Sequence, residues 1–213
     1  MMYCSHCCGI EKEFDQKHAA RDLKRYRKRG PGKTTRWLLD TITAWGLHGN
    51  VVLDIGGGVG AITHSLLEAG ARKAIFVEAS SAYMDAAQEE ARRQGHFERM
   101  TFLHGNFVDL AEHIPPADIV TLERVLCCYP DVHTLVRESA ARAQKIYGLV
   151  YPVEGPMTRI AWLVINSYLR LKRNPFRVYL HPTEIVNDLV QSQGLRQIFY
   201  KRTLLWQIVV FAR

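Results

Sequence analysis

Short apolar runs alternate with helical patterns through the middle of the chain, and this alternation sets the expected fold. The runs are rich in Val, Ile and Leu, which is typical of strands that are buried on both faces of a sheet. The expected strands cover residues 51–55, 74–79, 100–105, 118–124 and 146–152, and the helices between them cover 61–69, 80–94 and 131–145. This order predicts an α/β fold with a doubly wound, mostly parallel sheet and helices on both faces.

The two ends of the chain add further elements. At the C-terminal end, helical patterns over 157–171 and 182–193 precede two strand-like runs, 195–201 and 204–211. The two runs are close enough to form an antiparallel hairpin, which brings the expected sheet to seven strands.

Two helices are expected before the first strand. A basic helix spans 13–29, and Gly-Pro-Gly at 30–32 breaks it. Thr34 or Thr35 can cap a second helix that runs to about Trp45. The apolar stripe expected on this second helix consists of Trp37, Leu38, Ile42 and Trp45.

Charge is concentrated at the N-terminal end. The chain has 213 residues, of which 47% are hydrophobic and 23% charged, an ordinary globular composition. Residues 12–36 hold ten Lys and Arg against three Asp and Glu, a net charge of +7, which is the net charge of the whole chain. The sequence therefore predicts a neutral globular body with a basic N-terminal arm.

Several classes of protein do not fit this sequence. It contains no run of about 18 apolar residues, so no transmembrane helix is expected. The N-terminus lacks the apolar stretch of a signal peptide. The five cysteines do not form a disulfide framework, and we expect a reducing, cytoplasmic location.

A glycine-rich loop carries the main chemical signal. Residues 54–60 read Asp-Ile-Gly-Gly-Gly-Val-Gly and lie between an expected strand and an expected helix. Glycine lets the backbone turn sharply and lets a ligand approach main-chain atoms, and the helix offers its N-terminus to a negative group. The spacing does not match Gly-x-Gly-x-x-Gly of dinucleotide-binding proteins. Residues 32–34, Gly-Lys-Thr, lack the strand and the earlier glycine of a phosphate-binding loop.

The loop resembles the cofactor loop of the class I, Rossmann-like S-adenosylmethionine-dependent methyltransferases. Glu78 ends the second strand, 24 residues after Asp54, where that family has an acid that binds both ribose hydroxyls. Asn106 and Phe107 follow the third strand, where the family reads the adenine. The resemblance extends over about 34–152. It implies that S-adenosylmethionine is the cofactor and that it is bound by Asp54, Gly56, Gly58, Gly60, Glu78, Asn106, Phe107 and Glu123.

The segment after the fourth strand resembles one branch of that family. Residues 122–130, Leu-Glu-Arg-Val-Leu-Cys-Cys-Tyr-Pro, and 177–182, Arg-Val-Tyr-Leu-His-Pro, are similar to the branch that contains magnesium-protoporphyrin IX O-methyltransferase. That branch inserts a helical lid, which would be residues 153–180 here. The expected division is a basic helical arm, 1–33, and a Rossmann-like methyltransferase domain, 34–213. Cys128 and Arg124 stand where the branch often has His and Asp, so we expect only a small, mainly apolar acceptor.

The resemblance also suggests catalytic and acceptor-binding residues. Candidates for a general base are Glu123, Tyr129 and His181, and candidates for acceptor binding are Arg124, Cys128 and Tyr129. A carboxylate acceptor would need no base, and Arg124 could orient it. A purely structural role stays open for each: Glu123 and Arg124 can pair with each other, and His181 can cap or pack a helix.

The cysteines suggest two further sites. Cys4, His6, Cys7 and Cys8 lie within five residues, too close together for a usual zinc site, and no metal is expected. Cys127 and Cys128 near the expected pocket could touch the substrate or a soft metalloid, although cysteine is often a small buried hydrophobic residue.

Three interpretations of the basic arm stay open. It could cover the cofactor as a solvated lid helix, bind RNA phosphates, or contact an acidic partner or an anionic membrane. The apolar helix at 157–171 could pack on the core as a lid or lie in a bilayer interface.

A noncatalytic cofactor-binding protein, or one that binds or modifies RNA, is the alternative function. The Asn/Asp-Pro-Pro-aromatic loop of methyltransferases that act on nucleic-acid amino groups is absent after residue 124. The oligomeric state stays open.

Overall fold

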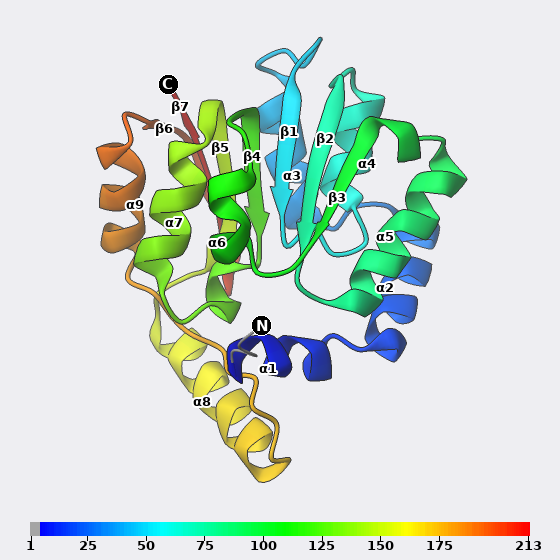
Figure 1. Ribbon diagram of the computed structural model, residues 1–213. Coiled ribbons are helices and arrows are strands. Elements are labelled where there is room, and N and C mark those ends of the chain that lie inside the picture. The colour runs from blue at the N-terminus through cyan, green and yellow to red at the C-terminus, as the bar shows by residue number, and fades with distance from the viewer. Residues whose placement is uncertain (1–4) are drawn as a thin grey trace.

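One mixed sheet forms the centre of the protein (Figure 1). The computed structural model describes residues 5–213, and its side chains from Gly9 onward. The strand order is β3-β2-β1-β4-β5-β7-β6, with β7 antiparallel to both of its neighbours. The strands are β1 (Val51–Ile55), β2 (Lys73–Glu78), β3 (Met100–His104), β4 (Ala117–Glu123), β5 (Ala143–Pro152), β6 (Arg196–Arg202) and β7 (Trp206–Ala212). The seven-stranded sheet with its antiparallel C-terminal hairpin is confirmed.

Helices cover both faces of this sheet. They are α1 (Ser5–Glu13), α2 (Gln16–Arg29), α3 (Lys33–Thr43), α4 (Ala61–Glu68), α5 (Ser81–Gln94), α6 (Phe107–Leu110), α7 (Val132–Ala141), α8 (Pro156–Leu171) and α9 (Thr183–Ser192), with short 3-10 turns η1 (Phe97–Arg99), η2 (Ala111–His113) and η3 (Leu126–Cys128). α3, α4 and α5 share a core with one face, and α6, α7 and α9 with the other. The doubly wound arrangement follows, because apolar strands such as β1 need cover on both sides.

The outer helices do not belong to these two layers. α2 packs on the outer side of α5 through Ala19 and Leu23, its two buried residues. α8 projects away from the sheet, and the chain returns beside it to α9 (Figure 1). α1 was not expected from the sequence.

Three local predictions were wrong. The helix α3 begins at Lys33 with Gly32 as its N-cap, so Thr34 and Thr35 are not caps but buried side chains inside the helix. Trp45 lies beyond the end of α3 and is 54% exposed, outside the apolar stripe. The chain leaves α7 after Ala141 and enters β5 at Ala143 instead of 146, because Ala143 pairs with Ala117 of β4. Ala and Lys at 140–145 suit a helix as well as a strand.

The strand order places a functional edge. β1 and β4 are neighbours although two strands separate them along the chain, so the connections leave their carboxyl ends in opposite directions. Ligands bind at such a switch point in open α/β sheets. Ile55, Glu78 and Glu123 end the three strands that meet at this edge.

Candidate active site

A cavity of about 580 Å³ lies at the carboxyl edge of β1, β2 and β4. Ten of the predicted site residues line it, namely Asp54, Gly56, Gly58, Glu78, Asn106, Phe107, Glu123, Arg124, Cys128 and Tyr129. Of the predicted set, Gly60 and His181 are not in the lining. Gly60 is the N-cap of α4.

Each glycine of the loop meets a different steric demand. A Cβ on Gly56 would lie 2.5 Å from Val125 Cγ2, and one on Gly57 would lie 2.3 Å from Phe76 Cε2. Gly58 has φ of +60°, and its Cβ would meet no atom closer than 3.8 Å. The first two glycines therefore let the loop pack on the core, whereas Gly58 faces open space in the cavity.

Asp54 supports the loop from below. Its carboxylate is 1% exposed and accepts hydrogen bonds from the hydroxyls of Thr63 and Thr121, each at 2.8 Å. Burial raises the pKa of Asp54 to about 7, although these two hydrogen bonds oppose the rise. Its charge is therefore sensitive near neutral pH to any cation that enters the cavity.

Glu78 at the end of β2 is held by backbone groups. Its carboxylate accepts from the N–H of Gly58 at 3.0 Å, of Ala79 at 2.8 Å and of Ser80 at 2.9 Å. Burial raises the pKa of Glu78 above its usual range in spite of these bonds. A carboxylate has about four lone-pair positions, so one position is left for a donor in the cavity.

Asn106 and Phe107 follow β3. The Asn106 side chain caps α6 by accepting from Val108 N–H at 3.3 Å, and its Nδ2 donates to the Tyr129 hydroxyl at 3.2 Å. Phe107 is buried and adds an apolar surface to the same wall. Asn106 thereby joins the wall after β3 to the turn after β4.

Glu123 and Arg124, at the end of β4, are tied to α3. The Thr35 hydroxyl donates to Glu123 Oε1 at 2.7 Å, and the Thr34 hydroxyl lies 3.4 Å from the same oxygen. Arg124 Nη2 donates to Thr34 Oγ1 at 3.2 Å, and its guanidinium lies 4.8 Å from the Trp206 ring centre. The separation of Arg124 Nε from Glu123 Oε1 is 3.9 Å.

Arg124 has an unusual backbone. Its φ is +60°, a left-handed conformation that costs about 1–2 kcal/mol in a residue with a side chain. Its N–H donates to the Val150 carbonyl at 2.7 Å, and this bond holds the turn in place. The turn directs the chain from β4 into η3 and along the cavity wall.

His181 is placed as a support for that wall. Its Nε2 lies 3.0 Å from the Leu126 carbonyl and 2.9 Å from the Tyr129 carbonyl. Carbonyl oxygens only accept, so Nε2 carries a proton and donates. Burial lowers the pKa of His181. The side chain joins the segment before α9 to η3.

The two central cysteines differ in access. Cys127 is buried, whereas Cys128 lines the cavity, and their sulfur atoms are 3.7 Å apart. The neighbouring Cys127 thiol and burial together raise the pKa of Cys128 well above its usual range. Cys4 lies outside the described residues, as do the side chains of His6, Cys7 and Cys8. Within the described part of the chain, no group of three metal-ligating side chains comes together.

The N-terminal helices form the other side of the cavity. Ile10 of α1, Phe14, and Tyr26 of α2 contribute apolar surface, and Arg25 and Arg29 of α2 add positive charge. Among the described residues of the expected lid, 153–180, none lines the cavity. The basic arm is thus part of the cavity wall.

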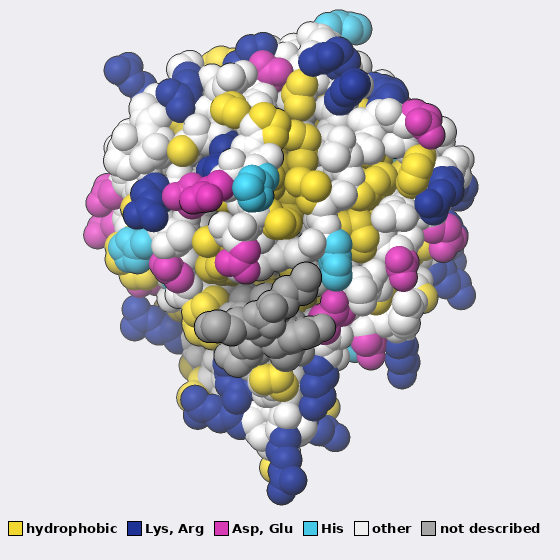
Figure 2. Space-filling view, in the orientation of Figure 1, with side chains coloured by type: hydrophobic (Ala, Val, Ile, Leu, Met, Phe, Trp, Pro, Cys, Tyr) yellow, Lys and Arg dark blue, Asp and Glu magenta, His cyan; other side chains and the backbone are white. Residues whose placement is uncertain are grey.

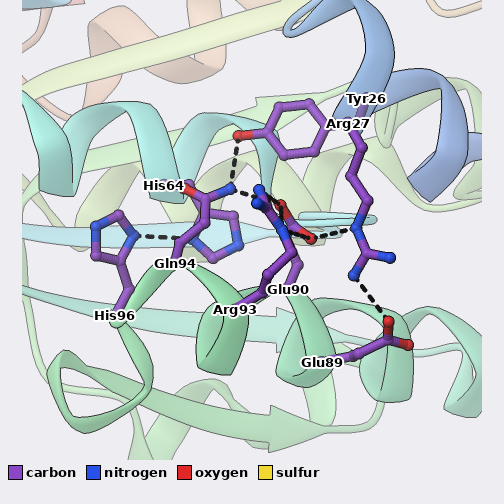
Figure 3. A network of polar contacts seen from close by, with 8 residues as sticks. All are labelled: Tyr26, Arg27, His64, Glu89, Glu90, Arg93, Gln94 and His96. Atoms are coloured by element: carbon purple, nitrogen blue, oxygen red, sulfur yellow. Dashed lines mark hydrogen bonds and ion pairs between the residues drawn. The ribbon is translucent and has the colours of Figure 1, made fainter.

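A polar network fixes α2 on α5 (Figure 3). Arg27 of α2 reaches buried Glu90 at 2.7 Å and Glu89 at 2.8 Å, and Arg93 binds Glu90 from its other side at 2.6 Å. Although burial acts to raise the pKa of Glu90, the hydrogen bonds from Arg93, Gln94 and Arg27 outweigh it and lower the pKa to about 2. The α2 side of the cavity is therefore anchored by a charged, mostly satisfied cluster.

Sequence reasoning missed several residues of this cavity. Thr35 was considered only as a cap, and Ile10 and Tyr83 were not considered as part of a site. Thr34, also considered only as a cap, is not in the lining but contacts Glu123 and Arg124. A Thr-Thr pair in the first turn of an amphipathic helix is the signal that could have found Thr34 and Thr35, because such side chains need partners when buried.

Comparison with known proteins identifies a domain. Residues 52–145 match the family profile described as "Methyltransferase domain". No curated protein gives a significant sequence match to this chain. Helices long and apolar enough to cross a bilayer are absent from the part of the chain that the structure describes.

Solved methyltransferase structures share the fold. Magnesium protoporphyrin IX methyltransferase from Synechocystis PCC 6803 with bound SAH is 20% identical with a TM-score of 0.72, covering 98% of this chain and 99% of that chain. The same enzyme with bound SAM is 19% identical with a TM-score of 0.70, covering 100% of this chain and 99% of that chain. Geranyl diphosphate methyltransferase in complex with GPP and sinefungin is 15% identical with a TM-score of 0.65, covering 84% of this chain and 76% of that chain.

Proposed function

Because residues 52–145 form a class I, S-adenosylmethionine-dependent methyltransferase domain, we propose that this protein methylates a small, mainly apolar molecule inside the cavity. The observation that carries the proposal is that the N-terminal helices line the site on the side away from the glycine loop. Ile10, Phe14 and Tyr26 face the glycine loop across a volume within the usual range for small-molecule sites.

The residues at one end of the cavity suit the cofactor. Gly58 leaves space where any side chain would intrude, and Glu78 keeps one acceptor position for a ribose hydroxyl. Asn106 and Phe107 would bind the adenine. Asp54 would support the glycine loop from below, and its carboxylate would lie near the positively charged part of the cofactor. When bound, S-adenosylmethionine supplies an electrophilic methyl group on a sulfonium.

The residues at the other end suit an acceptor. Glu123 and Tyr129 line the cavity and are the candidates to take a proton from the acceptor. Glu123 is oriented by Thr35, so its carboxylate is held ready without a large rearrangement. Arg124 and Cys128 would contact the acceptor beside them.

We assign His181 a positioning role instead of the base role suggested by the sequence. Its Nε2 proton is committed to two carbonyl oxygens, and burial lowers its pKa. It would keep η3, and with it Tyr129, at the correct distance from the cofactor.

The acceptor class is supported by the cavity and by the segment after β4. Cys128 and Arg124 differ from the pattern of the magnesium-protoporphyrin branch, so we do not extend the porphyrin named for the Synechocystis enzyme to this chain. The wall from α1 and Phe14 is apolar, which favours an apolar acceptor body.

The proposal is tested by following a labelled methyl group. The protein is incubated with methyl-labelled S-adenosylmethionine and a cell extract, which is then separated into organic-soluble, RNA and protein fractions. We expect label in the organic-soluble fraction. Label confined to RNA or to protein would overturn the small-molecule acceptor, and binding of cofactor without any transfer would favour a noncatalytic role.

A variant links transfer to the site. Glu78→Gln replaces a carboxylate oxygen that accepts from backbone N–H by an NH₂ group that cannot accept, so S-adenosylhomocysteine should bind at least tenfold more weakly in calorimetry. Glu112→Gln, an exposed residue away from the cavity, is the control and should bind normally. Equal affinity of the two variants would remove Glu78 from the cofactor site.

A further inference from the structure

The projecting helix α8 exposes an apolar surface that the body of the protein does not cover. Its exposed large apolar side chains have between 39% and 81% of their surface accessible. They are Met157, Ile160, Leu163, Val164, Ile165, Tyr168 and Leu171. Single exposed apolar residues are ordinary, but seven on one 16-residue helix form a continuous patch, and such patches mark interaction surfaces.

The same segment is strongly basic. Residues 155–182 contain Arg159, Arg170, Lys172, Arg173 and Arg177 and not one Asp or Glu. In Figure 2, Lys and Arg side chains surround the projection that Figure 1 identifies as α8, with apolar side chains between them. The neutral body therefore carries one local region of five positive charges at its apolar projection.

The buried side of α8 is fixed by its own returning chain. Trp162 Nε1 donates to the Tyr179 carbonyl at 2.8 Å, and the Asn166 amide forms bonds of 2.9 Å to both the N–H and the carbonyl of Val178. Trp162 also packs against Trp206, with the two ring centres 6.2 Å apart. These bonds fix which face of α8 is turned outward, so the apolar patch is a stable feature of the fold.

We propose that α8 docks on an anionic lipid membrane, with its apolar face in the acyl-chain boundary and its basic side chains at the headgroups. An amphipathic helix with Lys and Arg beside its apolar face has the composition of an interfacial helix. Anionic lipids of the cytoplasmic leaflet attract such basic segments. The docking does not depend on the proposed function.

A second copy of the chain fits this surface less well. Two α8 faces packed together would bring Arg159, Arg170, Lys172 and Arg173 of one copy near the same cations of the other. Glu154 pairs with Arg159 at 3.3 Å, but no carboxylate lies within 155–182 to compensate Arg170, Lys172 and Arg173. Like charges at a shared interface oppose association, whereas an anionic bilayer balances them.

Docking would also reach the candidate active site. The segment that returns from α8 donates Tyr179 N–H to the Cys127 carbonyl at 2.8 Å, and His181 binds the Leu126 and Tyr129 carbonyls. These bonds join the membrane-facing element to η3, which forms a wall of the cavity.

The test is co-sedimentation of the full-length protein with vesicles. Vesicles of phosphatidylcholine with one fifth phosphatidylserine are compared with phosphatidylcholine alone, at low and high salt. We expect binding to the anionic vesicles that falls at least tenfold in high salt or without phosphatidylserine. Absence of binding to anionic vesicles by the wild-type protein would overturn the proposal.

Variants separate α8 from the rest of the surface. Leu163→Asp combined with Leu171→Asp should reduce vesicle binding at least tenfold, while circular dichroism and calorimetry with S-adenosylhomocysteine show an intact fold and cofactor site. The control is Trp45→Ser, which removes an exposed aromatic side chain outside α8. Equal loss in both variants, or no loss in the α8 variant, would contradict the assignment. If the wild-type protein forms dimers and does not bind vesicles, and the α8 variant is monomeric, the occupant of the surface is a second copy of the chain.

Discussion

The glycine loop offers a sharp test, because neighbouring glycines are needed for different reasons. A Cβ on Gly57 would lie 2.3 Å from Phe76 Cε2 and 2.8 Å from the Asp54 carboxylate, and Phe76 is fully buried. A Cβ on Gly58 would lie no closer than 3.8 Å to Tyr83 and would project into the cavity. The same substitution, glycine to alanine, should therefore damage packing at one position and ligand binding at the other.

The magnitudes follow from this geometry. Gly57→Ala inserts a methyl group into a filled core, which typically costs about 1–3 kcal/mol of unfolding free energy. Gly58→Ala keeps its neighbours but places alanine at φ of +60°, at a cost of about 1–2 kcal/mol. The two losses of stability overlap, so stability alone does not separate the two causes. A second substitution, Phe76→Leu, does separate them, because it removes the ring atoms that Gly57→Ala would meet.

The assay is urea unfolding of the single and double variants, combined with calorimetry of S-adenosylhomocysteine binding. We expect a coupling free energy of about 1 kcal/mol or more between Gly57→Ala and Phe76→Leu. For Gly58→Ala and Phe76→Leu we expect less than about 0.5 kcal/mol, as for independent sites. Gly58→Ala should weaken cofactor binding at least tenfold.

Two results would refute this reasoning. If Gly57→Ala shows no coupling to Phe76→Leu, the loop does not pack on Phe76 as described. If Gly58→Ala binds S-adenosylhomocysteine as tightly as the wild type, the cofactor does not approach the loop at Gly58.

Two more predictions concern titrating groups. The lowered pKa of Glu90 stabilises the folded state above pH 4.5, and this stabilisation is lost as the pH falls toward 2. Glu90→Gln should therefore have a lower free energy of unfolding in urea than the wild type at pH 7, and the difference should narrow between pH 5 and pH 3. A difference that stays constant with pH would mean that Glu90 is not ionised in its cluster. Cys128 should react slowly with iodoacetamide at pH 8, since its thiol pKa is raised, and more slowly still with saturating S-adenosylhomocysteine. Mass spectrometry should find slower labelling of Cys128 with the ligand present, and no labelling of buried Cys127 with or without it. If the labelling rate of Cys128 is the same with and without S-adenosylhomocysteine, the thiol lies outside the site.

The strands and the cofactor loop could be predicted from sequence because the information there is local. Residues 51–55 are apolar almost throughout and are followed at once by glycines, and this combination is compatible with few structures. The spacing between Asp54 and Glu78 works in the same way, because a strand, a helix and a second strand must fit between them. Parallel strands then bring their carboxyl ends to one edge.

The far wall of the cavity could not be predicted in this way. The bond from Thr35 to Glu123 joins residues 88 positions apart, and nothing local distinguishes it from a helix cap. The position of α1 depends on contacts with the segment that follows α8, where Gly9 lies against the backbone of Phe176. The helix α8 itself was predicted correctly, but periodicity identifies an apolar face without showing what covers it.

The position of the cavity-closing helices at the start of the chain has a consequence for synthesis. Helices α1 and α2 and the start of α3 leave the ribosome before β1, yet the residues on which α2 and α3 rest come later in the chain, as far as Glu123 at the end of β4. Leu23 of α2 waits for Val59, Ala82 and Ala86, and Thr35 of α3 waits for Glu123. At about 5–20 residues per second, the 88 positions that separate Thr35 from Glu123 take roughly 4–18 s to be made. The arm is therefore translated first, but its side chains find their native partners only as these later segments emerge.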